Sequence, residues 1–134
     1  MTDFDTSDEV LPSNMDSKRA IRLCGSTEDV DTVVDLTKHG DPRVRRSALK
    51  QMCPCRVKQD VGPFWDRVFQ MVNDEDDDVR GQVLHTICDG SPTHLESEVS
   101  DALEVFNRDP NSKIRRQAHK ALTAYRKTGK WNVL

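Results

Sequence analysis

The chain has few aromatic residues and no long apolar run. Only 5% of its 134 residues are Phe, Trp or Tyr, whereas 32% are charged. This composition favours a helical protein built on small and aliphatic contacts over a β-sandwich. No stretch approaches the 18 or so consecutive apolar residues that a membrane-spanning helix needs, so we expect no membrane span.

The N-terminal segment also lacks the basic and apolar parts of a secretory signal peptide. Four cysteines without an export signal indicate free thiols in a reducing compartment, so we expect a cytoplasmic protein. Residues 1–16 hold five acidic and no basic side chains, which predicts a disordered acidic tail. Residues 17–134 are then expected to form one monomeric repeat domain.

Charge is segregated along the chain, although the net charge is only −3. Residues 17–59 carry +5, residues 60–107 carry −10, and residues 108–134 carry +7. The total charge therefore does not indicate the class of partner that the protein binds.

One short segment recurs three times at a spacing of 35 residues. The copies are DPRVRRSALKQM (41–52), DDDVRGQVLHTI (76–87) and NSKIRRQAHKAL (111–122). Each contains an aliphatic residue, here called position 0, followed by Arg. Apolar residues stand at positions 0, +4 and +8: Val44, Ala48, Met52; Val79, Val83, Ile87; Ile114, Ala118, Leu122. These positions share one face of an α-helix, so each copy predicts a helix with a buried stripe.

A second amphipathic pattern precedes each copy, over residues 28–40, 62–74 and 93–109. Gly40 is placed to end the first of these helices, and Pro63 lies near the start of the second. Thr93 and Glu96 have the spacing of a capping box at the start of the third. Each unit is therefore expected to be a hairpin of a helix A and a helix B, over about 28–53, 61–89 and 93–127.

A period of 35 residues with two helices per unit is typical of a helical repeat array. One hairpin cannot bury its apolar face alone, so neighbouring hairpins are expected to stack around a shared core. Residues 15–24 predict a further short helix against the first unit. Tyr125 and Trp131 are expected to cover the last unit.

The repeat resembles the HEAT-repeat family, specifically its short bacterial-type repeats. The family pattern is Asp-x-x-x-x-Val-Arg-x-x-Ala-x-x-x-Leu, and residues 74–87 and 109–122 match it well. The first copy, residues 39–52, departs at the leading position, where His39 stands in place of Asp. Over residues 28–126 the resemblance implies an all-α protein, a right-handed α-solenoid of about three HEAT-like helical hairpins.

The resemblance also implies a structural role for the charges at the turns. Asp74 and Asp109 would hydrogen-bond the helix-B arginine of their own or of a neighbouring unit. The arginines in question are Arg45, Arg80 and Arg115. The other acids of the DEDDD run suit a helix N-terminus, whereas a calcium loop would need a glycine and a bidentate Glu that are missing.

Helix-B positions +2 and +6 are expected to point away from the core, because +6 lies opposite the centre of the buried stripe. In HEAT-like solenoids the B helices line the concave surface, so the resemblance implies a partner-binding face there. Its residues would be Arg46, Lys50, Gly81, His85, Arg116 and Lys120. Gly81 would leave room for a partner's side chain.

This face has three interpretations. It could be a solvated surface, a site for an acidic protein segment, or a track for nucleic-acid phosphates. The charge of −10 over residues 60–107 argues against nucleic-acid binding, because it repels phosphates. The scarcity of Trp and Tyr for base stacking also argues against it.

Cys53, Cys55, His85 and Cys88 are candidate ligands for a metal, because Zn²⁺ takes four nitrogen or sulfur ligands. Their C-x-C…H-x-x-C spacing is not a common zinc motif, so we interpret the cysteines as small packing residues. A Cys–His nucleophilic pair would lack a third, orienting group. We therefore expect no metal, no cofactor and no enzymatic activity.

The sequence thus predicts a non-catalytic scaffold or adaptor that holds a protein partner, which could present an acidic segment. A nucleic-acid-binding HEAT-like protein is the first alternative. An accessory subunit of a modifying enzyme, as in lyase-associated HEAT-like proteins, is the second. Repeat scaffolds host many unrelated tasks, so the repeat does not choose among these hypotheses.

Overall fold

The computed structural model describes residues 10–51 and 61–131. All regular secondary structure in these ranges is helical, so the predicted all-α class is confirmed for this part of the chain. The α-helices are α2 (Ser17–Ser26), α3 (Val30–Leu36), α4 (Pro42–Gln51), α5 (Gly62–Gln70), α6 (Asp77–Gly90), α7 (Glu96–Phe106) and α8 (Ser112–Thr128). Short 3₁₀ helices are η2 (Pro12–Asn14), η3 (Met71–Asn73) and η4 (Thr93–Leu95).

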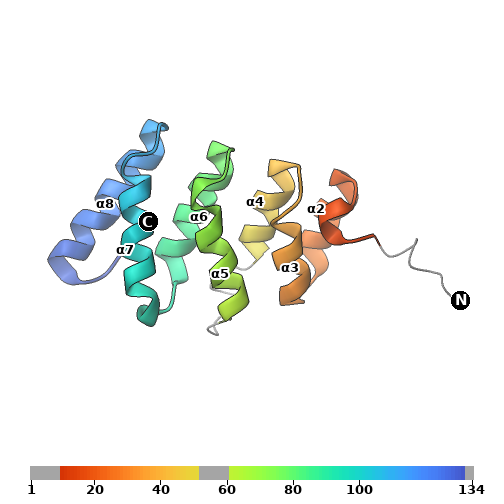
Figure 1. Cartoon of the computed structure of the whole chain (residues 1–134), viewed down its shortest axis with the longest axis horizontal. Coiled ribbons are helices and arrows are strands. Elements are labelled where there is room, and N and C mark those ends of the chain that lie inside the picture. The colour runs from red at the N-terminus through yellow and green to blue at the C-terminus, as the bar shows by residue number, and fades with distance from the viewer. Residues whose placement is uncertain (1–9, 52–60, 132–134) are drawn as a thin grey trace, which may run out of the picture.

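The helices lie side by side in two layers along the longest axis of the molecule (Figure 1). The B layer contains α2, α4, α6 and α8, each of which contacts the next. The A layer contains α3, α5 and α7, where η3 extends α5 toward α7. The pairs α3–α4, α5–α6 and α7–α8 correspond to the three hairpins expected from the repeat.

The core lies between these layers and is formed by the predicted stripes. Every described helix-B residue at positions 0, +4 and +8 is at most 3% exposed. Met52, at position +8 of the first copy, lies outside the described residues. The A helices contribute larger side chains, including Val33, Phe64, Val68, Leu103 and Phe106, all at most 1% exposed. The 3.6-residue periodicity of the sequence therefore identified the buried face of the B helix in each hairpin.

Short polar side chains stand at the N-cap of most B helices, where their oxygen atoms accept hydrogen bonds from backbone N–H groups. Asp16 accepts from the Arg19 N–H at the start of α2, and Asp76 accepts from the Val79 N–H at the start of α6, each at 3.0 Å. Asn111 caps α8 through the backbone N–H of Ile114. These side chains satisfy amide donors that have no partner inside the helix.

The predicted capping box at Thr93 is wrong. Thr93 is already inside η4, so its hydroxyl is not at the N-cap position, and no side chain caps η4 or α7. Glu96 instead accepts a hydrogen bond of 2.6 Å from the Tyr125 hydroxyl, which joins α7 to α8. The first A helix also ends earlier than Gly40, because the chain turns more tightly after Leu36.

Part of the segment expected to be a disordered tail packs against the first hairpin. Residues 12–14 form η2, and the Ser13 N–H donates to the Asp35 carboxylate at 2.8 Å. His39 binds the Met15 carbonyl through its Nε2. Residues 1–9 of the predicted tail lie outside the described residues. The short helix expected at 15–24 is α2, which packs against α4 through Ala20 and Cys24.

Trp131 and Tyr125 cover the last hairpin, as the sequence predicted. The Trp131 side chain is buried, and its Nε1 donates to the Ser91 hydroxyl at 2.9 Å. Its ring centroid lies 5.8 Å from that of Tyr125. Among the described helices, none combines the length and the apolar character required to cross a bilayer.

The buried stripe predicts a contrast between two neighbouring substitutions in α8. Ala118 is fully buried, so Ala118→Asp should lower the free energy of unfolding by at least about 3 kcal/mol, because an unpaired carboxylate would enter the core. Lys120 is exposed, and Lys120→Asp should change it by less than about 0.5 kcal/mol. Chemical denaturation of both variants measures this, and equal losses would contradict the assigned helical phase.

Candidate partner-binding face

Arginine–aspartate pairs connect successive units along the edge where the A helices turn into the B helices. Arg45 of α4 donates through Nε and Nη2 to the two carboxylate oxygens of Asp74, each at 2.9 Å. Its Nη1 donates to the carbonyls of His39 and Gly40 in its own turn. Both side chains of this pair are at least 90% buried. The hydrogen bonds to Asp74 raise the pKa of Arg45, so this guanidinium stays charged.

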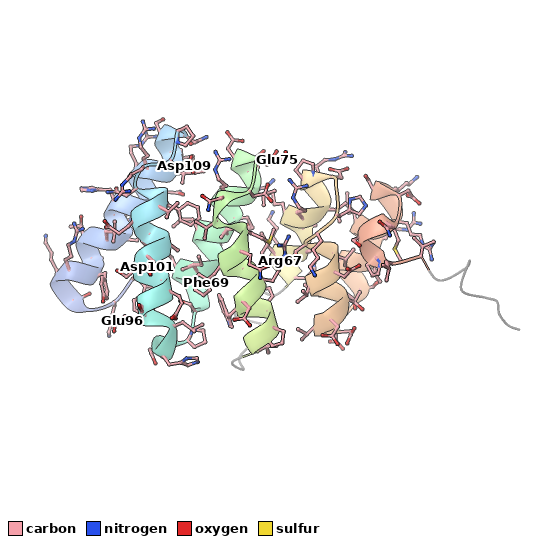
Figure 2. All side chains as sticks on the ribbon, in the orientation of Figure 1. Arg67, Phe69, Glu75, Glu96, Asp101 and Asp109 are labelled. Atoms are coloured by element: carbon pink, nitrogen blue, oxygen red, sulfur yellow. The ribbon has the colours of Figure 1, made fainter. Side chains whose placement is uncertain are left out.

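Arg80 repeats this arrangement one unit further along. Its Nε and Nη2 donate to the Asp109 carboxylate at 2.8 and 3.2 Å, and its Nη1 donates to the Asp74 carbonyl at 2.8 Å. Figure 2 shows Glu75, beside Asp74, and Asp109 at the same edge of the molecule, away from Glu96. Of the two pairings left open by the sequence, the structure has the arginine bind the aspartate of the following unit.

Each of these aspartates also orders the turn that precedes its own B helix. Asp74 accepts from the Asp76 N–H at 3.0 Å, and Asp109 accepts from the Asn111 N–H at 2.8 Å. His39 has the same role in the first unit, because its Nδ1 accepts from the Asp41 N–H at 2.9 Å. The imidazole therefore replaces the aspartate as a turn acceptor, although it offers no carboxylate to an arginine.

A further arginine, which the repeat pattern did not predict, connects units within the A layer. Arg67 of α5 donates through Nε to the Thr37 hydroxyl and through Nη2 to the Thr37 carbonyl, each at 2.9 Å. Figure 2 shows Arg67 on the side of α5 that faces α3. Burial lowers the pKa of Arg67. The end of α3 thus receives a cation, which is favourable at a helix C-terminus.

A groove of about 420 Å³ opens on the B layer, on the side of the molecule away from the A helices. It extends from α6 to α8, and Arg46 of α4 reaches its border. The lining residues are Arg46, Asp77, Asp78, Gly81, Gln82, His85, Asn111, Lys113, Ile114, Gln117 and Lys120. The helices α6 and α8 pack less extensively on each other than α4 and α6 do, which leaves this space.

The groove contains four of the six residues predicted for the binding face: Arg46, Gly81, His85 and Lys120. Lys50 instead lines a smaller depression of about 150 Å³ between α4 and α6, where Arg46 also lies. Arg116 is exposed and lines neither space. The six residues therefore all lie at the surface, but they do not form one continuous row.

The acidic part of this groove was not predicted from the sequence. Asp78 and Lys113 occupy position −1 of their helices, and this position lies next to +6 on the helical wheel, on the side away from +2. Asp77 accepts from the Asn111 amide at 2.9 Å, a contact between the starts of α6 and α8. The expected basic face is therefore mixed, with two carboxylates near the turns and cationic side chains around them.

Gly81 leaves the middle of the groove open. A Cβ atom added at this glycine would have no heavy atom within 4 Å, apart from the helix's own backbone. The other side chains at +2 are arginines, which would fill this space. A partner can consequently approach the backbone of α6 closely at this point.

The four candidate zinc ligands are not brought together in the described part of the chain. Cys53 and Cys55 lie outside it. His85 is exposed in the groove, whereas Cys88 is fully buried in the core, so the two side chains face different surroundings. Carboxylate oxygens of Asp76, Asp77 and Asp78 do lie within 4.8 Å of one another. The Asp76 carboxylate is already used as the cap of α6.

Comparison with protein-family models, with curated proteins and with solved structures found no match to this chain.

The Arg45–Asp74 pair yields a prediction about stability. Asp74→Ala should lower the free energy of unfolding by roughly 3 kcal/mol or more, because it leaves a buried guanidinium without its carboxylate. Asp78→Ala is the matched control, since Asp78 is exposed in the first turn of α6 and should contribute less than about 1 kcal/mol. Urea denaturation compares the two, and similar losses would show that the buried pair is not important for stability.

Cys88 yields a prediction about reactivity. Burial raises the pKa of its thiol to about 12, so the reactive thiolate is scarce at pH 8. Iodoacetamide should leave Cys88 unmodified in the native protein and modify it after unfolding, as peptide mass spectrometry can measure. The unfolded thiol ionises near pH 9, so this group should reduce stability as pH rises from 9 toward 12. Rapid alkylation of native Cys88 would contradict this burial.

Proposed function

We propose that this protein is a non-catalytic scaffold that holds a protein partner in the groove between α6 and α8. The feature that carries the proposal is a mainly polar groove on the outer side of the B layer, with Gly81 in its middle. The groove exposes hydrogen-bonding and charged groups of both signs, which a folded or extended protein segment can match.

The charges of the groove favour a partner segment with an acidic part. Arg46, Lys113 and Lys120 contribute positive charge, and His85 adds an imidazole that can form hydrogen bonds. Asp77 and Asp78 are concentrated at the start of α6. A partner with acidic residues toward Lys120 and a donor or basic residue toward Asp77 would be complementary.

A nucleic acid fits this groove less well. Two carboxylates line it, and they would repel a continuous phosphate backbone. None of its lining residues is Phe, Tyr or Trp, so the groove lacks the large aromatic rings on which bases stack best.

The repeat pattern and the ladder of Arg45–Asp74 and Arg80–Asp109 also support a HEAT-like right-handed α-solenoid, and we propose this architecture. In such a scaffold the B helices would line the concave surface. We further propose that the protein acts without catalysis, because His85 and Cys88, which are adjacent on the helix, do not share one surface.

Gly81 provides the sharpest test of this function. Gly81→Leu should block the groove, yet it should stabilise α6 by roughly 1 kcal/mol, because leucine is a better helix former than glycine. Any loss of binding would then not come from unfolding. Lys38→Glu, a charge reversal at an exposed site that does not line the groove, is the control for nonspecific electrostatic effects.

The measurement is affinity capture from the source cell after nuclease treatment, followed by titration of the purified partner. We expect wild type and Lys38→Glu to retain the same protein, and Gly81→Leu and Lys120→Glu to bind it at least about tenfold more weakly. Equal binding by all four proteins would exclude the groove. Loss of all capture on nuclease treatment, with a steep dependence of binding on salt, would instead favour a nucleic-acid partner.

A further inference from the structure

The face of α8 that carries positions +5 and +9 differs from the same face of α4 and α6. Position +5 is Leu49 in α4 and Leu84 in α6, and both leucines are fully buried. In α8 this position is His119, which is exposed. Position +9 also becomes more polar and more exposed: it is the buried Cys88 in α6 and the partly exposed Thr123 in α8. This face of α8 is therefore polar and is not suited to bury another helix.

Arg115 nevertheless has the geometry of the ladder arginines. Its Nη1 donates to the carbonyls of Asp109 and Pro110 at 2.7 and 3.0 Å. Arg45 holds the carbonyls of its own turn in the same way, at 2.9 and 3.0 Å. The guanidinium of Arg115 is thus anchored by two carbonyls although its side chain is exposed.

Among the described residues, the remaining edge of Arg115, formed by Nε and Nη2, is open. In Arg45 and Arg80 this same edge binds both oxygens of an aspartate carboxylate. Within residues 10–51 and 61–131, no acceptor occupies it in Arg115. Arg115 is therefore anchored by its own turn, as Arg45 and Arg80 are, but among the described residues it lacks the carboxylate that each of those two arginines binds.

We propose that this edge of Arg115 is a second binding site, which takes a carboxylate side chain from an acidic segment of a protein partner. The planar guanidinium matches a carboxylate in two parallel hydrogen bonds, which a lysine cannot reproduce. Anchoring by the turn carbonyls reduces the conformational entropy lost on binding. Arg116 and the positive charge of residues 108–134 attract an acidic segment toward it.

A second copy of the chain, stacked head to tail, fits this site poorly. The residue of the first unit that corresponds to Asp74 and Asp109 is His39, which offers no carboxylate. Its ring is buried and already bound to the Asp41 N–H and the Met15 carbonyl. The turn of a stacked copy would therefore not supply the carboxylate. The site is also separate from the groove, which Arg115 does not line.

The test uses a synthetic peptide with the sequence of residues 72–80, because this segment presents Asp74 as the ladder does. The full chain, labelled with ¹⁵N, is titrated while the Nε–Hε resonance of Arg115 is followed by NMR. We expect this resonance to shift saturably, and those of Arg45 and Arg80, which are already paired, to stay in place. A peptide with Asp74→Asn, which keeps the other acids, should bind at least about fivefold more weakly.

Two protein variants separate hydrogen-bond geometry from charge. Arg115→Lys keeps the charge but loses the planar edge, so it should bind the peptide about tenfold more weakly. Arg116→Lys is the matched control and should bind like wild type. Gly81→Leu should also bind like wild type, so a failure here is distinguishable from a failure of the proposed groove function.

Three results would overturn the proposal. The Arg115 resonance could remain unchanged up to millimolar peptide, or Arg115→Lys could bind as tightly as wild type. A short single-stranded oligonucleotide of matched charge could also shift the Arg115 resonance where the peptide does not, which would assign the edge to phosphate.

Discussion

The arginine–aspartate pairs that α4 and α6 make with the following unit are the interaction on which the rest of this structure depends. Arg45 and Arg80 each bind carbonyls of their own turn and the aspartate of the next unit. Taking these charges out of water is costly, and it is tolerated because nearly every donor has an acceptor. The aspartate in turn orders the backbone before its own helix. One side-chain network thus sets the spacing of successive units and the start of each B helix.

The position of the groove follows from this network. With the starts of α6 and α8 held at one edge, positions −1 and +6 of both helices and position +2 of α6 line the same groove. Side chains at those positions decide what the surface can bind: Asp78 and Lys113 add opposite charges, and Gly81 adds space. In the part of the chain that the structure describes, the same network leaves Arg115 anchored with one edge open, and this is the basis of the second binding site that we propose.

Much of the fold was predictable from the sequence because helix periodicity is a local property. The stripe at 0, +4 and +8 identified residues such as Val79 and Ala118, which are fully buried. Local reasoning failed where distant contacts compete with it. Glu96 was expected to cap its own helix but binds Tyr125, which lies 29 residues away. Arg67 had no sequence signal, because its acceptors are on a helix that only stacking brings near.

The sequence by itself determined the helices, the buried faces of the B helices, the 35-residue period and the residues that belong to the turns. These features depend on spacing along one helix, which the chain carries in its order of residues. Only the tertiary structure decided which unit each arginine binds, how Asp77 and Asp78 join the groove, and that His85 and Cys88 face different surroundings. Those outcomes depend on the distance and rotation between helices, which the packing of side chains from separate units sets.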